Sequence, residues 1–379
     1  MTATLHTTLT NAETGTSPQS LPNYTSATQT VYVRVIENGT TTNCYAVAEV
    51  QLTVNPKPVI PTITTFELCD VNASGNGIEE FDLTVKNDEI TGSDTALTVS
   101  YFLNQADASA PVPTGAIANP STHTNTASPN QQTIWVRVQD ANGCFAVSSF
   151  IIQVNPLPAV SNAVYNLCED TNSQAGFNLH SKDAEITQNA AGITVSYFET
   201  LLAAQDGTAG EITANPYTTG SKTVYARVEN NTTGCFAIAE LQLVVIEFPT
   251  LGTATPVVVC ANTNSTNGTF NLTPAINQIL NGQTGITATV HTTLANANLG
   301  TAPQSQTAYT GGTQTVYVRL VLNGTNPVCF QVETISLIVN PNPVIPVITP
   351  YELCDFNNPG DGVEQFDLTT KNNEITGGD

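Results

Sequence analysis

The eight cysteines are the residues of this 379-residue sequence whose type and spacing most clearly indicate chemistry. They form two series along the chain, and no two of them have a Cys-x-x-Cys spacing. With only four histidines, a zinc site lacks a ligand set. An even number of cysteines without metal or redox motifs indicates structural disulfides and an oxidising compartment. The first series is Cys44, Cys144, Cys235 and Cys329, and the second is Cys69, Cys168, Cys260 and Cys354.

Two sets of disulfides are compatible with this spacing. Pairing across the linkers would join each first-series cysteine to the next second-series cysteine and use all eight. It would also require a strand of about ten residues, some 33 Å long, and a proline-rich linker to fold back until the two Cα atoms lie within about 7 Å. We therefore expect pairing inside each repeat, with the linker set as the alternative. The expected bonds are Cys69–Cys144, Cys168–Cys235 and Cys260–Cys329, which leave Cys44 and Cys354 unpaired.

Acidic, glycine-rich loops follow the second-series cysteines. Asp70, Asn72, Glu79 and Asp82 belong to one such segment. Alternating oxygen ligands in a loop of this kind can surround Ca²⁺, although Phe81 occupies the position where an EF-hand needs a bidentate glutamate. An Asx- and Gly-rich turn without an ion is the simpler interpretation. We expect no required cofactor and keep Ca²⁺ as a candidate ion for these residues and for Asp355, Asn357 and Asp361.

An aromatic residue and an arginine two positions later recur on one strand of each repeat. We expect such a pair to pack across the sheet, and keep a platform for a ligand such as a sugar as the alternative. The pairs are Tyr32/Arg34, Trp135/Arg137, Tyr225/Arg227 and Tyr317/Arg319.

The histidines do not indicate catalysis. His6 and His291 occupy one repeat position, where other copies carry Phe102 and Phe198. A position that accepts either Phe or His is a packing position, whereas nucleophilic catalysis needs a base beside its nucleophile. We therefore predict that the protein is not an enzyme.

Internal repeats position all of these residues. Residues 2–94 align without a gap on residues 287–379, an offset of 285. The first cysteine series advances by 100, 91 and 94 residues and the second by 99, 92 and 94, so both sum to the same offset. Two independent markers therefore share one repeat frame.

Proline-rich segments such as Val54–Pro58 and Val154–Pro158 separate the repeats, because closely spaced prolines end strands and act as semi-rigid spacers. The chain then comprises an N-terminal part-repeat, three complete repeats and a C-terminal part-repeat. These are the N-terminal part-repeat (1–55), repeat A (56–155), repeat B (156–246), repeat C (247–340) and the C-terminal part-repeat (341–379).

Each repeat has the pattern of an all-β domain. Val31, Val33 and Val35 alternate with other residues, as do Ile134 and Val136, which predicts strands with one buried face. Strands beginning at the cysteines follow, and Asn-Gly or Gly-Cys segments make each pair a hairpin. We expect a short helical turn near residues 86–90 and no other helices. About seven strands per repeat predict tandem immunoglobulin-like Greek-key β-sandwiches of 91–100 residues, arranged as beads on a string.

Charge and hydropathy exclude several kinds of partner. Nine basic against 31 acidic residues give a net charge of −22, so there is no basic surface for nucleic acid or an anionic membrane. The longest apolar candidate, Leu241–Phe248, is interrupted by Gln242 and Glu247 and is far shorter than the ~20 residues of a membrane helix. We expect no direct membrane insertion of this region.

Five short motifs resemble the tandem repeats of very large cell-surface proteins of Bacteroidetes. The motifs are Glu-Leu-Cys-Asp, Phe-Asp-Leu-Thr, Thr-Val-Tyr-Val-Arg-Val, Asn-Gly-Cys-Phe-Ala-Val and Val-Asn-Pro-x-Pro. The proteins they resemble are exported by the type IX secretion system and include gliding-motility adhesins of the SprB kind. The resemblance implies an extracellular chain at the outer-membrane surface. Export by this route is implied by the resemblance alone.

The expected function is that of a stalk, the structural repeat region of a secreted adhesin used in surface attachment or gliding. Its partners would be an external surface, a glycan or other adhesin molecules. Two alternatives stay open: the repeats themselves bind glycan or a partner protein, or they are a non-catalytic appendage of a secreted hydrolase. The acidity fits a stalk, because like-charged repeats repel one another and stay soluble.

Overall fold

The computed structural model describes residues 1–39, 42, 44–170 and 172–378. Two compact units account for the chain. The first comprises Met1–Ala159 together with Glu229–Ala237, and the second comprises Val160–Val228 together with Ile238–Asp379. The two units are described separately below.

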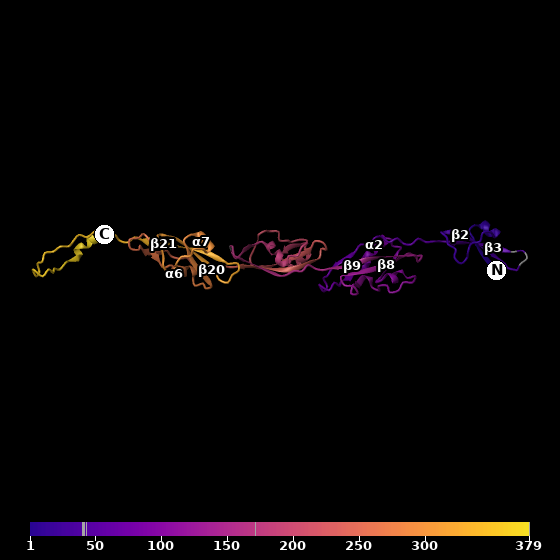
Figure 1. The fold of residues 1–379 in the computed structure, drawn as a ribbon, viewed down its shortest axis with the longest axis horizontal. Helices are drawn as coiled ribbons and strands as arrows, with labels where there is room; N and C mark the ends of the chain where they lie inside the picture. The colour runs from indigo at the N-terminus through magenta and orange to yellow at the C-terminus, as the bar shows by residue number, and fades with distance from the viewer. Residues whose placement is uncertain (40–41, 43, 171, 379) are drawn as a thin grey trace. The chain divides into compact units, whose positions relative to one another are not determined.

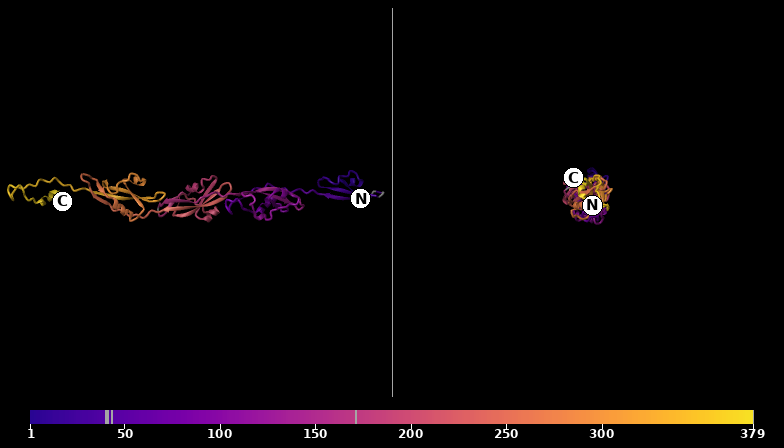
Figure 2. Two further views of the ribbon diagram at one scale, coloured as in Figure 1. Left: turned by 60° about the horizontal axis from the view of Figure 1, so that its bottom comes forward. Right: turned by 90° about the vertical axis from the view of Figure 1, so that its left-hand side faces the viewer.

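Repeat A forms a four-stranded sheet and a small two-stranded sheet, whose strands are coloured purple in Figure 1 and shown from two further directions in Figure 2. In the larger sheet the first pair of neighbouring strands is parallel and the other two pairs are antiparallel. The larger sheet has the order β4 (Phe66–Cys69), β9 (Phe145–Asn155), β8 (Gln131–Gln139), β6 (Thr98–Phe102), and the smaller pairs β5 (Glu80–Phe81) with β7 (His123–Thr124).

The core of repeat A follows from the period of two in its strands. Ile134, Val136 and Val138 of β8 are fully buried, and they pack with Phe81 and Ile90 in one hydrophobic cluster. Short helices complete this repeat: η1 (Leu83–Lys86), α2 (Asn87–Thr91), α3 (Gln105–Ser109) and η2 (Pro120–Thr122).

The N-terminal part-repeat has three antiparallel strands and one helix. The order of its sheet is β1 (Thr2–His6), β2 (Gln29–Ile36), β3 (Tyr45–Leu52), and α1 (Leu9–Thr14) follows β1.

Repeat B, in the second unit, has the topology of repeat A. Its sheets have the orders β10 (Ala163–Cys168), β15 (Phe236–Ile246), β14 (Lys222–Asn230), β12 (Ile193–Phe198) and β11 (Ala175–Phe177), β13 (Tyr217–Thr219). Its helices are η3 (Leu179–Lys182), α4 (Asp183–Ile186) and α5 (Leu201–Asp206). The tip of its β14–β15 hairpin belongs to the first unit.

Repeat C repeats this arrangement, and the C-terminal part-repeat contains only two short helices among its described residues. The sheets of repeat C have the orders β16 (Val257–Cys260), β21 (Phe330–Asn340), β20 (Gln314–Leu322), β18 (Ile286–His291) and β17 (Gly268–Phe270), β19 (Tyr309–Gly311). The helices are α6 (Thr273–Leu280) and α7 (Leu294–Leu299), followed by η4 (Leu368–Lys371) and α8 (Asn372–Thr376).

The prediction of an all-β fold made of tandem sandwich-like repeats is confirmed, as is the helical turn near residues 86–90. The expectation of no other helices was wrong. A helix of five or six residues follows the strands β1, β6, β12 and β18. Strand β5 ends at Phe81, because the Asp82 side chain accepts the Thr84 amide N–H and caps η1. None of the helices in the described part of the chain has the length and apolarity that a membrane crossing requires.

Candidate functional site: the cysteines that join consecutive repeats

A tight turn presents Cys235 at the tip of the β14–β15 hairpin. The Oδ1 atom of Asn230 accepts the amide N–H groups of Thr232 and Thr233. Gly234 closes the turn with a φ of 70°, in the left-handed region that favours glycine. Its N–H donates to the Asn230 carbonyl at 2.8 Å, and Cys235 directly precedes β15. The turn therefore fixes where the thiol is placed.

The partner of Cys235 is Cys69, the last residue of β4 in the preceding repeat. Parallel pairing places Cys69 opposite Asn155 of β9, and the next amide N–H, of Asp70, bonds the Asn155 carbonyl at 2.9 Å. The sulfur atoms are bonded, with Cα atoms 5.5 Å apart, and 166 residues separate the two cysteines. Cys235 is fully buried. The disulfide thus joins repeat A to repeat B.

The second unit contains the same connection one repeat later. Cys168 at the end of β10 is bonded to Cys329, with Cα atoms 5.5 Å apart and a separation of 161 residues. A polar contact supports this junction, since the Asn166 side-chain amide donates to the Asn326 carbonyl at 3.3 Å. Thr325 Oγ1 accepts the Cys329 amide N–H. Repeat B is therefore joined to repeat C as repeat A is to repeat B.

The predicted pairing inside each repeat was wrong. In repeat A, Cys69 lies opposite Asn155 at one end of β9, whereas Cys144 precedes Phe145 at the other end. Ten residues of extended strand span about 33 Å, far more than a disulfide bridges. The linker alternative is not formed either. Pairs of cysteines with similar separations, here 166 and 161 residues, are visible in the sequence, but only the docking of a hairpin onto the preceding repeat shows that these pairs are bonded.

Four cysteines have no disulfide in the chain. Cys144 and Cys260, which we expected to be bonded, are among them. Three of the four, Cys44, Cys260 and Cys354, are exposed, and Cys144 is partly exposed.

The acidic loop after Cys69 is organised by its own carboxylates. Asp70 and Glu79 are 3% and 4% exposed. Asp70 Oδ2 accepts the amide N–H groups of Gly75 and Gly77, and Glu79 Oε1 accepts those of Val71 and Asn72. Gly77 has a φ of 67°, and a Cβ atom there would lie 2.2 Å from Asn130 Oδ1, so only glycine fits.

Three of the residues predicted to hold Ca²⁺ accept backbone N–H groups. Asp70 and Glu79 accept those of their own loop, and Asp82 caps η1. No group of three or more His, Cys, Asp or Glu gathers in the described ranges of the chain. Calcium binding stays a prediction that these contacts do not test.

The same loop recurs in the C-terminal part-repeat. Asp355 Oδ2 accepts the N–H groups of Gly360 and Gly362, and the Asp361 carboxylate accepts that of Val363. Asn357 contacts Glu364, a residue that sequence reasoning omitted. The amide N–H groups of Asn357 and Phe356 lower the pKa of the Glu364 carboxyl. Glu364 thus takes the role of Glu79.

The arginines predicted to form a ligand platform are parts of the fold. The Arg137 side chain, 3% exposed, donates to the carbonyls of Ala108 and Ala110 beside α3 and lies 3.3 Å from the centre of the Phe145 ring. Arg34 makes the same contacts with α1 and Tyr45, and Arg319 with α7 and Phe330. Arg227 donates to carbonyls of α5. The earlier aromatics of the pairs, Tyr32, Trp135, Tyr225 and Tyr317, are half-buried.

The two corresponding histidines are packing residues, as their exchange for Phe predicted. His6 and His291 are fully buried. In each ring, Nδ1 bonds a backbone carbonyl, of Thr16 or Thr301, and Nε2 bonds a threonine hydroxyl two residues earlier.

Comparison with known proteins supports the inter-repeat connection. A family model described as the Flavobacterium inter-domain disulphide bond domain matches residues 1–58, 65–158, 164–249 and 256–343. No catalytic family is indicated, and no curated protein matches the sequence.

Several solved structures are similar at low identity. The extracellular domain of protocadherin γB4 is 12% identical, with a TM-score of 0.17, over 90% of this chain and 58% of its own. Domains 3–5 of Drosophila OTK are 10% identical, with a TM-score of 0.22, over 74% and 96%. A SusE-like surface-located polysaccharide-binding protein from the heparin utilisation locus of Bacteroides thetaiotaomicron is 11% identical, with a TM-score of 0.23, over 84% and 53%.

Proposed function

Because this chain belongs to the Flavobacterium inter-domain disulphide bond domain family, we propose that it is a stalk region of a secreted cell-surface adhesin. In this role it projects an adhesive region that contacts an external surface, a glycan or other adhesin molecules. Disulfides persist in oxidising compartments outside the cytoplasm, which supports an extracytoplasmic location.

The observation that carries the proposal is the pair of disulfides between consecutive repeats. Contacts between neighbouring domains in one chain are usually small and allow them to move apart. A disulfide from a buried hairpin cysteine to the preceding repeat keeps the two repeats from separating when the chain is pulled. Such resistance to pulling is useful in a spacer that carries tension and is not needed in a catalytic domain.

The repetition of the sequence supports the same role. Residues 2–94 and 287–379 align without a gap and share most of their residues. Closely similar copies supply length, since stacked repeats contribute nearly independent increments. The arginines, which could have marked a ligand surface, bond the fold's own carbonyls.

The test compares two changes in the adhesin that carries this region. In one, a 285-residue unit is deleted; in the other, the unit is replaced by unrelated immunoglobulin-like domains of equal total length. A stalk predicts that adhesion falls with the deletion and is retained with the replacement. Equal loss in both variants would contradict it and favour repeats that bind glycan or protein themselves. Loss of a hydrolytic activity instead of adhesion would favour the appendage of a hydrolase.

A further inference from the structure

The acidic loop of repeat A contains a carboxylate oxygen without a hydrogen-bond partner. Asp70 is 3% exposed, and its Oδ2 atom accepts the amide N–H groups of Gly75 and Gly77 at 2.7 and 3.2 Å. Its Oδ1 atom is buried, and no described residue bonds it. Buried polar atoms in proteins are nearly always satisfied, so an exception of this kind requires an explanation such as a bound ion.

The charge of this loop is not balanced by a basic side chain. Asp70 and Glu79 are both buried, and neither forms an ion pair within the described ranges of the chain. Lys86, the next basic residue after the loop, is paired with Glu89. Buried charges are normally paired or coordinate a metal ion. A cation at Asp70 therefore explains the charge as well as the unpartnered oxygen, whereas a water molecule explains only the oxygen.

Three further oxygen groups follow Asp70 at alternate positions of the sequence. The Asn72 side chain donates through Nδ2 to a carboxylate of the loop, so its Oδ1 atom stays available, and the Ser74 hydroxyl and the Asn76 carbonyl come next. An EF-hand loop takes its Ca²⁺ ligands from its first, third, fifth and seventh residues and has glycine in sixth place. Gly75 is the sixth residue here and has a φ of 98°.

We propose that this loop binds Ca²⁺ through Asp70 Oδ1. The Asn72 Oδ1 atom, the Ser74 hydroxyl and the Asn76 carbonyl supply further ligands, and waters complete the coordination, as Ca²⁺ allows. Phe81 replaces the glutamate of the twelfth EF-hand position, so the set contains one carboxylate. Affinity falls with fewer charged ligands, and we expect a dissociation constant on the order of 10⁻⁴–10⁻³ M, the range of extracellular modules.

The loop of the C-terminal part-repeat has the same unpartnered oxygen. Asp355 Oδ2 accepts the N–H groups of Gly360 and Gly362 at 2.7 and 3.1 Å, and Oδ1 is again buried without a partner among the described residues. The Asn357 side chain donates through Nδ2 to Glu364, as its counterpart does in repeat A. The two loops differ in sequence between these residues, so the shared arrangement belongs to the site and not to one local misfit.

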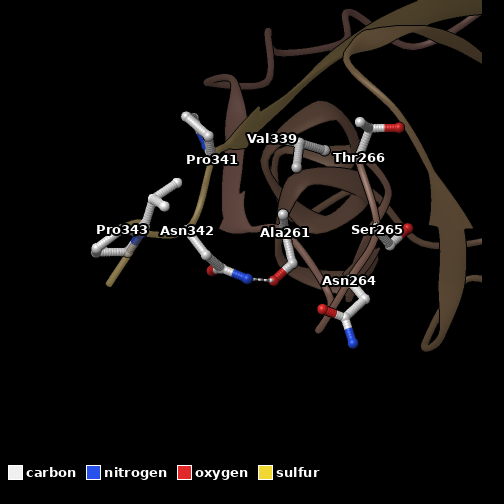
Figure 3. Close-up of a pocket in the computed structure, with 9 residues that line it drawn as sticks. Ala261, Asn264, Ser265, Thr266, Val339, Pro341, Asn342 and Pro343 are labelled. Atoms are coloured by element: carbon white, nitrogen blue, oxygen red, sulfur yellow. Dashed lines mark hydrogen bonds between the residues drawn. The ribbon is translucent and has the colours of Figure 1, made fainter. Parts of the chain in front are cut away.

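Repeats B and C lack this arrangement and serve as controls within the chain. In repeat B the residue after the cysteine is Glu169, whose carboxylate accepts the Phe248 amide N–H at 2.9 Å. In repeat C it is Ala261, whose side chain has no oxygen. Figure 3 shows Ala261 with Asn264 and Ser265 around a pocket of about 520 Å³. Ca²⁺ is therefore expected at the two aspartate loops and not in repeats B and C.

Calorimetric titration of the full chain with CaCl₂ tests the proposal. Asp70→Asn with Asp355→Asn should weaken binding at least about tenfold, because each site loses its charged ligand. Asparagine still has an oxygen that accepts the glycine N–H groups, so the loops keep their fold. The matched control is Asp94→Asn with Asp206→Asn, which removes two exposed carboxylates and should bind as the unaltered chain does.

Two results of this titration would overturn the proposal. One is the absence of saturable binding by the unaltered chain at Ca²⁺ concentrations up to about 10 mM, which is roughly tenfold above the expected range. The other is equal binding by the two double variants, which would show that Ca²⁺ responds only to the net charge. Both results concern Ca²⁺ affinity and not adhesion, so they leave the stalk function untouched.

A variant that strengthens the site separates a ligand from a residue that only shapes the loop. Ser74→Asp adds a carboxylate at the fifth position and should tighten Ca²⁺ binding about tenfold, because affinity rises with the number of charged ligands. Ser121→Asp, at an exposed position elsewhere in repeat A, is the matched control and should leave the affinity unchanged. Equal affinities in these two variants would overturn the assigned ligand set.

Discussion

At the scale of single residues, one arginine in each repeat holds a short helix against the sheet. Its guanidinium donates to carbonyls at the end of that helix, and in the N-terminal part-repeat and in repeats A and C it stacks on the aromatic residue that follows the first-series cysteine. The carbonyls at the C-terminal end of a helix carry the negative end of its dipole, so a cation is favourable there. Burial lowers the pKa of the Arg137 guanidinium, but the group remains a cation at neutral pH.

Replacing this arginine should destabilise its repeat. Arg137→Ala removes charged hydrogen bonds and a cation–π contact, and we expect the free energy of unfolding to fall by about 2–4 kcal/mol. Arg137→Lys should restore only part of it, because an ammonium lacks the planar face that stacks on the Phe145 ring. Denaturant unfolding measures the change. Lys57→Ala, at an exposed position, is the control for the loss of a positive charge. An equal fall in the free energy of unfolding for Lys57→Ala would contradict the structural role of Arg137.

The sequence placed each arginine on a strand beside an aromatic residue, which favoured packing over a ligand platform, but it did not identify the groups that the arginine contacts. The aromatic that stacks on Arg137 is Phe145, on the next strand, and not Trp135. The helix that supplies the carbonyls was not predicted. Its five or six residues are too few to show helical periodicity, so only its caps mark it.

At the scale of elements, those caps are visible in retrospect. Thr8, Thr200 and Thr293 each accept the amide N–H three residues later, and Asn104 does the same for α3. Gly15, Gly207 and Gly300 end three of the helices in the left-handed conformation. A Thr or Asn cap followed by Gly is a helix signal that needs no periodicity. The strands, in contrast, were predictable because their valines alternate over many residues.

A second element-level contact fixes the linker before β4. The Glu89 carboxylate accepts the amide N–H and the hydroxyl of Thr64, and it also bonds Lys86. Lys86, with help from Thr64, lowers the pKa of Glu89. In the C-terminal part-repeat, Lys371 and Thr349 lower the pKa of Glu374 to about 2.

This contact should depend on pH. Because the folded-state pKa of Glu89 is lowered, the stabilisation is complete above the ordinary carboxyl value of 4.5 and is lost as pH falls through the lowered value. Hydrogen exchange should show the Thr64 amide protected near neutral pH and less protected in acid. Glu89→Gln should weaken protection at neutral pH, whereas Asp88→Asn, at an exposed neighbour, should leave it unchanged.

At the scale of the whole molecule, the repeat frame was the most predictive feature of the sequence. It predicted that the chain is made of tandem β-sandwich repeats in which the cysteines recur. It could not identify the disulfide partners, because each bond depends on one hairpin docking against the preceding repeat. That docking is a tertiary contact between segments about 160 residues apart.

Removing one inter-repeat bond should lower stability. Cys69→Ser with Cys235→Ser opens a loop of 166 residues, and the chain-entropy model gives a loss of about 5 kcal/mol. Calorimetry should show a lower unfolding temperature for repeats A and B. Cys144→Ser is the matched control, because that thiol has no disulfide in the chain. An unchanged unfolding temperature in the double variant would contradict the assigned pairing.

The two disulfide loops, Cys69 to Cys235 and Cys168 to Cys329, overlap. Every peptide bond between Cys69 and Cys329 therefore lies inside at least one closed ring. A protease that hydrolyses a single bond anywhere in that span leaves both pieces tied together, and two cuts inside a ring are needed to release a fragment. A protease site inserted at residues 157–160 should thus separate the chain only after reduction, while one at residues 58–62 should separate it at once. A tandem array with overlapping disulfides therefore stays connected after a single cleavage that would separate domains joined only by their linkers.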